Sequence, residues 1–237
     1  MRYRFFIALF IGAGLMACSA VNTITVEGDA VPVTQEYENS NAIDSMVAPY
    51  KLEMDLQMDS VIATAEHDYI KGRPGGALNN WSADVILDAY VSEMDSAILD
   101  PIFCLLNVGG LRNPISKGDV TLGDIYKLMP FDNEVVAVRM PLSSILQIEE
   151  YLKKSGGEPI AGTTILNGKL LLDGADHDTK SFWIVTSDYL FNGGDNMDFF
   201  EQNIAVNRTG VLMRDVMING ARSQGVLKWD DTNRISF

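Results

Sequence analysis

The chain has 237 residues, of which 47% are hydrophobic and 21% charged, a balance typical of an ordinary globular protein of one large or two small domains. Its formal net charge is -14, and a surface this acidic repels phosphate backbones, which excludes nucleic acid as an expected partner. An anionic ligand would instead have to be held by a few well-placed arginines.

The N-terminus is expected to be an export signal. Two arginines precede an apolar stretch over residues 5–15, which is too short to span a bilayer as a stable helix. The following Leu15-Met16-Ala17-Cys18 resembles the lipobox of bacterial lipoproteins, in which the signal is cut before a lipidated cysteine. We therefore expect residues 1–17 to be a lipoprotein signal peptide and Cys18 to carry a lipid anchor. The alternatives are an ordinary secretory signal and a buried N-terminal helix.

This resemblance implies a lipid-anchored protein of the bacterial cell envelope, and Ser19 after the cysteine is compatible with the outer membrane.

Residues 18–43 carry alternating β-branched side chains and a polar stretch, which fit either a tether or a first strand. Residues 44–66 are rich in Met and Leu at mixed helical spacings. They predict a long helix or a helix followed by a strand, with the methionines filling the core.

Residues 78–94 follow with apolar positions at helical spacing, which predicts a helix. The continuous apolar run over residues 100–106 predicts a buried strand that ends at the turn Gly109-Gly110. Cys104 lies in this run and is expected to be a buried small hydrophobe. If Cys18 is lipidated, Cys104 has no partner for an internal disulfide.

A helix is predicted over residues 121–128 with Thr121 as its cap, then a strand over 134–140 and a helix over 141–154. The dipeptide Asn167-Gly168 between two short apolar runs predicts a hairpin. The last predicted elements are a strand over residues 182–187, a helix over 209–222 and a terminal segment over 226–237. This order predicts one α+β domain, a single mixed α/β domain over residues 44–237.

Three loops between the predicted elements carry polar and aromatic side chains: Asn107–Arg112, Met129–Asn133 and Ser187–Asp195. Taken singly, each is an ordinary turn. Together they supply aromatic faces to sandwich a base, a carboxylate to accept from ribose hydroxyls, and Arg and Asn for polar edges.

The combination resembles, in order and spacing, the C-terminal domain of 5'-nucleotidases. That family has an N-G-G-G-I-R-like turn, a helix leading into L-P-F, and a later N-x-F-L-x-N-G-G-D-G-like loop. The corresponding segments here are the three loops just named, and residues 78–84 look like the family's L-G-N-L-I-A-D segment. The resemblance covers most of residues 44–237 and implies the fold of that domain.

The resemblance also implies roles for single residues. Phe131 and Tyr189 would clamp the base, with Tyr189 in place of the more usual phenylalanine. Asp195 would bind the ribose hydroxyls, and Asn107 and Arg112 would contact the base or sugar edge. The alternative for Phe131 is a core aromatic.

Arg73, just upstream of residues 78–84, would correspond to the family's additional substrate arginine, with gaps in the alignment between them. Val108 and Asn196 stand where the family frequently has glycine.

In this family, a separate N-terminal metallophosphoesterase domain cleaves the phosphate ester with two metal ions held by several His and Asp residues. Such a centre needs a dense ligand set. This chain has only His67 and His177, far apart in sequence and each next to acidic residues, and both are expected at the surface. We therefore expect no catalytic residue, metal site or cofactor in this chain.

Three functions remain open at this point. The first is a split 5'-nucleotidase in which this chain recognises the nucleoside or nucleotide and a separate metallophosphoesterase protein cleaves the phosphate ester of the nucleotide. The second is a stand-alone envelope protein that binds nucleosides or nucleotides. The third is a degenerate domain kept for interactions. The preferred base is not predicted, because stacking tolerates every base.

Overall fold

A computed structural model describes residues 41–93 and 100–237. Contacts divide the chain into two compact units, Met1–Met46 and Val47–Phe237, and only residues 41–46 of the first unit are described. Cys18 and the predicted signal peptide lie outside the described residues. So does most of the predicted tether, of which only residues 41–43 are described, and these are helical. None of the helices in the described ranges has the length and apolar character to cross a bilayer.

The first described elements confirm a helix followed by a strand, α2 (Asn41–Met58) and β1 (Val61–Ala65). The expectation that the methionines fill the core is wrong, because α2, described over its whole length, has no buried residue. Met54, for example, is 53% exposed. Its apolar residues from Tyr50 to Met58 recur at every second position, so on a helix they point in all directions rather than toward one core-facing side.

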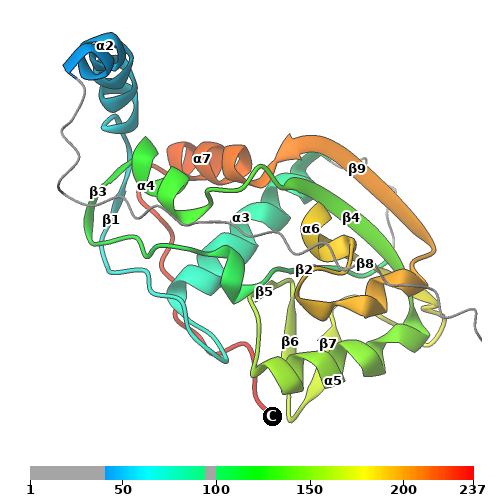
Figure 1. The fold of residues 1–237 in the computed structure, drawn as a ribbon. Coiled ribbons are helices and arrows are strands. Elements are labelled where there is room, and N and C mark those ends of the chain that lie inside the picture. Colours follow the sequence, from blue (N-terminus) through cyan, green and yellow to red (C-terminus); the bar gives the residue numbers. More distant parts are fainter. Residues whose placement is uncertain (1–40, 94–99) are drawn as a thin grey trace, which may run out of the picture. The chain divides into compact units, whose positions relative to one another are not determined.

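The centre of the second unit is a five-stranded sheet in the order β5-β2-β8-β4-β9 (Figure 1). Its strands are β2 (Ile102–Leu105), β4 (Glu134–Pro141), β5 (Ile160–Ala161), β8 (Ser181–Ser187) and β9 (Ala205–Leu212). The pair β2–β8 is parallel and the other three pairs are antiparallel. The sheet therefore contains both parallel and antiparallel pairs, and its strands alternate with helices along the chain, as the predicted mixed α/β domain implies.

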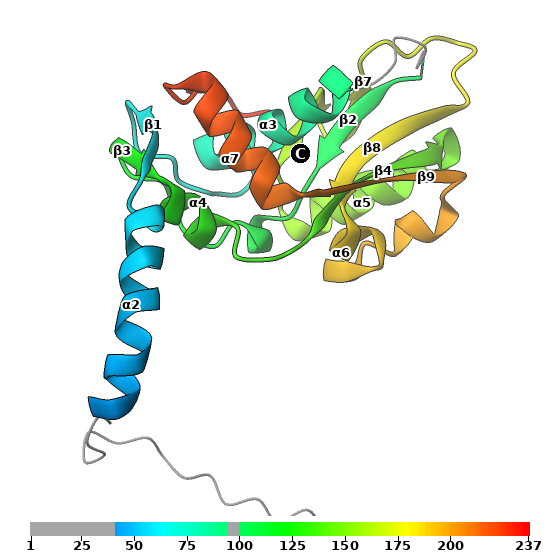
Figure 2. The same cartoon turned by 90° about the horizontal axis from the view of Figure 1, so that it is seen from above.

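Helices cover both faces of this sheet (Figure 2). On one face pack α3 (Ala77–Glu93) and α7 (Met213–Gln224), and on the other α5 (Ile145–Ser155) and α6 (Asp188–Phe191). Because neighbouring residues of a strand point to opposite faces, Cys104 packs into the first layer while Phe103 and Leu105 pack into the second. This burial on both faces explains the continuous apolar run over residues 100–106.

Several local predictions are confirmed. The helix α4 (Leu122–Leu128) follows β3 (Gly118–Thr121), which pairs with β1, and Thr121 and Asp124 form a reciprocal capping box. The hairpin β6 (Thr163–Leu166) and β7 (Lys169–Leu172) turns at Asn167-Gly168, whose φ angles of 52° and 73° suit a two-residue turn.

Two element boundaries differ from the prediction. The predicted helix over 141–154 begins only at Ile145, after a 3₁₀ turn over Leu142–Ser144, because Pro141 still pairs in β4. The predicted helix over 209–222 is a strand up to Leu212, because β9 pairs with the edge of β4. Tertiary pairing here overrides a helical pattern.

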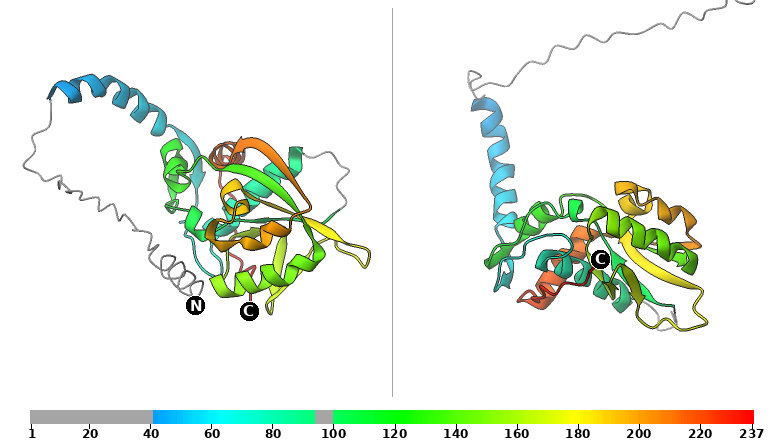
Figure 3. Two further views of the ribbon diagram at one scale, coloured as in Figure 1. Left: turned by 45° about the vertical axis from the view of Figure 1, so that its right-hand side comes forward. Right: turned by 90° about the horizontal axis from the view of Figure 1, so that it is seen from below.

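The C-terminal segment runs over the surface from β1 to the β6–β7 hairpin (Figure 3). The backbone N–H of Leu227 donates to the carbonyl of Thr64, and the N–H of Gly168 donates to the carbonyl of Ser236. Between them, Arg234 forms an ion pair with Asp84 of α3 at 2.7 Å. The segment therefore connects elements that are distant in the sequence.

Candidate functional site

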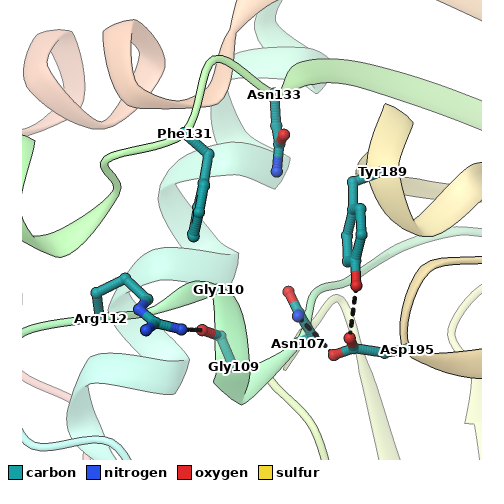
Figure 4. Close-up of a pocket in the computed structure, with 8 residues that line it drawn as sticks. All are labelled: Asn107, Gly109, Gly110, Arg112, Phe131, Asn133, Tyr189 and Asp195. Atoms are coloured by element: carbon teal, nitrogen blue, oxygen red, sulfur yellow. Dashed lines mark hydrogen bonds between the residues drawn. The ribbon is translucent and has the colours of Figure 1, made fainter. Parts of the chain in front are cut away.

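A pocket of about 300 Å³ lies where the three predicted loops meet (Figure 4). Its lining residues come from all three loops and are Asn107, Gly109, Gly110, Arg112, Phe131, Asn133, Tyr189 and Asp195. The structure thus brings together five of the six predicted site residues, all except Arg73.

Two aromatic side chains form opposite walls of this pocket. Figure 4 shows the rings of Phe131 and Tyr189 facing each other across the open space. Phe131 is 39% exposed and Tyr189 is 47% exposed, so the alternative in which Phe131 is a core aromatic is wrong. Large exposed aromatic faces of this kind offer stacking surface to a planar ligand.

Phe131 is held in place by an arginine from α7. The guanidinium of Arg214 donates through Nη1 to the carbonyl oxygens of Met129 at 3.5 Å and of Phe131 at 3.3 Å, and it pairs with the carboxylate of Asp132. It also lies over the ring of Tyr126, 4.5 Å from the ring centroid. Arg214 is only 9% exposed, so a buried side chain holds the loop that presents Phe131.

The loop with Asn107 and Arg112 is also held by a buried charged side chain, that of Glu158. Its middle is a 3₁₀ turn over Val108–Gly110. The Val108 N–H donates to the carboxylate of Glu158 at 2.7 Å, and Glu158 is 2% exposed and paired with Arg73. Buried charged side chains therefore hold the loops on both sides of the pocket.

The polar floor of the pocket is a short chain of hydrogen bonds. Asn107 Nδ2 donates to Asp195 Oδ2 at 2.6 Å, and the Tyr189 hydroxyl donates to Asp195 Oδ1 at 2.9 Å. This hydrogen bond to Asp195 and the charge of the Asp195 carboxylate raise the pKa of the Tyr189 hydroxyl, which stays a donor at neutral pH.

Asp195 lies in a loop with an unusual backbone. Gly193 has a φ of 87°, Asp195 a φ of 53° and Asn196 a φ of 62°, all in the left-handed region. This conformation folds the loop back so that the Asp195 carboxylate meets the ring end of Tyr189. Asn196 adopts it although the resemblance leads us to expect glycine there.

The two predicted arginines occupy different places. Arg112 lines the aromatic pocket, with its guanidinium carbon 5.9 Å from the centroid of the Phe131 ring and Nη1 3.3 Å from the carbonyl of Gly109. Arg73 lines a neighbouring pocket of about 360 Å³ with Lys154 and Tyr151. Asp195 is on the wall of both pockets, so they adjoin at this carboxylate.

Three residues that shape the site are absent from the set predicted from the sequence. Asn133 lines the pocket two residues after Phe131, and this spacing within the predicted loop was an available signal. Arg214 was detectable as a cation in the first turn of α7, directly after the apolar Met213. No feature of the sequence distinguishes Glu158, because its role depends on a contact with Val108, which is 50 residues away.

The two histidines are exposed, as predicted. His67 stacks on Trp229 with ring centroids 4.4 Å apart, and the His177 side chain is 88% exposed. Across residues 41–93 and 100–237, no three His, Cys, Asp or Glu side chains are grouped so that they could hold a metal ion. Cys104 is fully buried, and burial raises the pKa of its thiol well above the usual value.

The fold is similar to that of solved nucleotidases. It superposes on a 5'-nucleotidase precursor from Thermus thermophilus with a TM-score of 0.67 at 21% identity, over 81% of this chain and 42% of that one. For an NAD nucleotidase from Haemophilus influenzae the TM-score is 0.62 at 17% identity, over 84% of this chain and 41% of that one. At these identities the likeness is one of fold.

Sequence comparison points to the same group. The chain is 22% identical to an apyrase from Tabanus yao over 67% of its length, and 25% identical to the protein UshA from Yersinia enterocolitica over 78% of its length. It spans only 34% and 35% of those two proteins. The sequence profile of the family described as 5'-nucleotidase, C-terminal domain, matches residues 61–159. Residues 61–159 therefore carry the sequence features of a 5'-nucleotidase C-terminal domain.

Proposed function

We propose that this chain binds a nucleoside or nucleotide between Phe131 and Tyr189 and acts as the recognition subunit of a split 5'-nucleotidase. The observation that carries the proposal is the pair of exposed aromatic rings that face each other above the carboxylate of Asp195. The base would stack between the rings, and its sugar would lie over the carboxylate.

The chemistry of the pocket suits each part of a nucleoside. Stacking of a base on an aromatic side chain contributes about 1–3 kcal/mol in nucleic-acid complexes. The Asp195 carboxylate accepts from sugar hydroxyls, and the carboxamides of Asn107 and Asn133 can pair with donors and acceptors on the base or sugar. Arg112 supplies a positive charge at the pocket wall of an otherwise acidic protein, which suits the phosphate of a nucleotide.

A separate metallophosphoesterase chain would supply the hydrolytic step. Cleavage by two metal ions needs several closely spaced ligands, and the two histidines of this chain are both exposed and distant in sequence. The divalent metals are accordingly proposed for the partner alone. This chain would contribute substrate binding and orientation.

Calorimetric titration with adenosine and AMP tests the binding step. The wild-type chain is expected to bind, and Phe131→Ala is expected to weaken binding at least about fivefold, because one stacking face is removed. Phe237→Ala is the matched control, since Phe237 is 46% exposed and outside the pocket. Equal affinities of Phe131→Ala and the wild type would refute binding at this site.

The split arrangement has its own test. Phosphate release from AMP is measured for metallophosphoesterase chains of the same organism, with and without this chain. The proposal expects activity that rises on mixing and falls again when Phe131→Ala replaces the wild type. Nucleoside binding without any rise on mixing would favour the stand-alone binding protein instead.

We also propose that Cys18 is lipidated and holds the chain at the bacterial cell envelope, on the sequence grounds given above. Labelling of cells with a radioactive fatty acid is expected to mark the wild-type chain and not Cys18→Ala. Label that persists in the variant would contradict the anchor.

A further inference from the structure

Both oxygens of the Asp195 carboxylate accept hydrogen bonds from side chains of other elements. Asn107, from the loop after β2, donates to Oδ2, and Tyr189, on α6, donates to Oδ1. A phenylalanine at position 189 would form the same aromatic wall but would have no hydroxyl to donate. The Tyr189 hydroxyl therefore adds a hydrogen bond to Asp195 that the aromatic ring alone cannot make.

The carboxylate retains acceptor capacity for a ligand. An ionised carboxylate has about four acceptor positions, of which these two donors use one on each oxygen. About one position on each oxygen remains. The 2'- and 3'-hydroxyls of a ribose are adjacent donors and can meet one oxygen each. A sugar that lacks them leaves these acceptors unmatched.

Two donors on different oxygens also fix the plane of the carboxylate. The terminal torsion of an aspartate is broad, so a carboxylate held at Oδ2 alone can turn about its last bond. The Tyr189 hydroxyl prevents this rotation. Its ring can reach Asp195 only because residue 194 is glycine, since a Cβ there would lie 2.5 Å from Tyr189 Cε1.

We propose that the Tyr189 hydroxyl is a positioning group that makes this pocket select ribonucleosides over nucleosides without the sugar diol. The inference rests on the proposed nucleoside binding and adds a sugar specificity to it. The ring of Tyr189 stacks on the base whatever the sugar, whereas its hydroxyl acts on the sugar through Asp195. The two contributions of this one residue can therefore be measured separately.

The experiment is a calorimetric titration of the full chain with adenosine and with 2',3'-dideoxyadenosine. The wild type is expected to prefer adenosine. In Tyr189→Phe the adenosine Kd should rise about three- to tenfold, as expected for one hydrogen bond, while the Kd of the dideoxy ligand changes by less than about twofold. Tyr50→Phe is the control, since it removes a hydroxyl from an exposed residue of α2 outside the pocket and should alter neither Kd.

An equal effect of Tyr189→Phe on both ligands, or no effect on adenosine, would overturn the inference and leave nucleoside binding intact. A wild type that binds both ligands equally would overturn it as well. Failure of the wild-type chain to bind either ligand would instead remove the proposed function, and this inference with it.

Discussion

The guanidinium of Arg214 donates to the backbone carbonyl of Phe131 at 3.3 Å, so a buried cation on α7 holds the loop that presents one wall of the pocket. The same guanidinium reaches the carbonyl of Met129 and the carboxylate of Asp132. The aromatic wall is therefore positioned by the helix layer behind it as well as by its own loop.

Arg214→Ala should separate this anchoring from the stacking itself. Removing the guanidinium leaves two backbone carbonyls without their donor, and we expect a loss of about 1–3 kcal/mol in the free energy of unfolding. Adenosine affinity should fall as well, because the loop with Phe131 is released. Urea denaturation and calorimetry measure the two effects. Arg222→Ala, an exposed residue on the same helix, should change neither, and identical behaviour of the two variants would contradict the anchoring role.

Glu158→Gln tests the anchor on the other side of the pocket. The substitution keeps the shape of the side chain but removes the charge that accepts from the Val108 N–H and pairs with Arg73. Because Arg73 is partly exposed and can be solvated, we expect a loss of about 1–3 kcal/mol rather than the larger cost of an isolated buried charge. Urea denaturation measures this loss. Glu150→Gln, on the exposed face of α5, is the control, and a loss of equal size there would rule out a specific role for Glu158.

Gly110→Ala should damage binding with little effect on folding. A Cβ on Gly110 would lie 2.6 Å from Asn107 Oδ1, so the side chain of Asn107 must move and release Asp195. The φ of Gly110 is not positive, so alanine brings no left-handed strain. We expect the adenosine Kd to rise at least about tenfold, as for a lost charge-assisted hydrogen bond. Gly75→Ala, where a Cβ has ordinary contacts, should bind like the wild type. Retained affinity in Gly110→Ala would argue against a role for the Asn107–Asp195 pair.

Stability at high pH should report on Tyr69. Burial, with a smaller contribution from the carboxylate of Glu66, raises the pKa of its hydroxyl from 10.0 to about 12. Below the unfolded value both states hold the proton. As the pH rises toward about 12 the unfolded chain loses its proton first, so up to about 3 kcal/mol of stability is lost.

Urea denaturation at neutral and at strongly alkaline pH measures this loss. Tyr69→Phe should lose less stability than the wild type over the same interval, because it has no hydroxyl to ionise. Tyr50→Phe, which alters an exposed residue of α2, should follow the wild type. Parallel losses in all three proteins would show that Tyr69 does not contribute.

Much of the local structure follows from the sequence because its causes are local. Capping at Thr121, the hairpin at Asn167-Gly168 and the apolar run over residues 100–106 depend on neighbours within a few positions. One prediction was wrong because of a distant partner: β9 is a strand because β4 lies beside it. The wrong prediction for α2 has a local cause, because the apolar residues of this helix do not share one side.

The order of the three loops, and the residue types they carry, were determined by the sequence alone. Only the tertiary structure decided which of those side chains meet. Asn107 and Asp195 are 88 residues apart and touch because β2 and β8 lie side by side in the sheet and lead into the two loops. Arg73 lines the neighbouring pocket because its guanidinium forms an ion pair with Glu158. A hydrogen bond needs two groups within about 3 Å, and that distance is set by the packing of the whole domain.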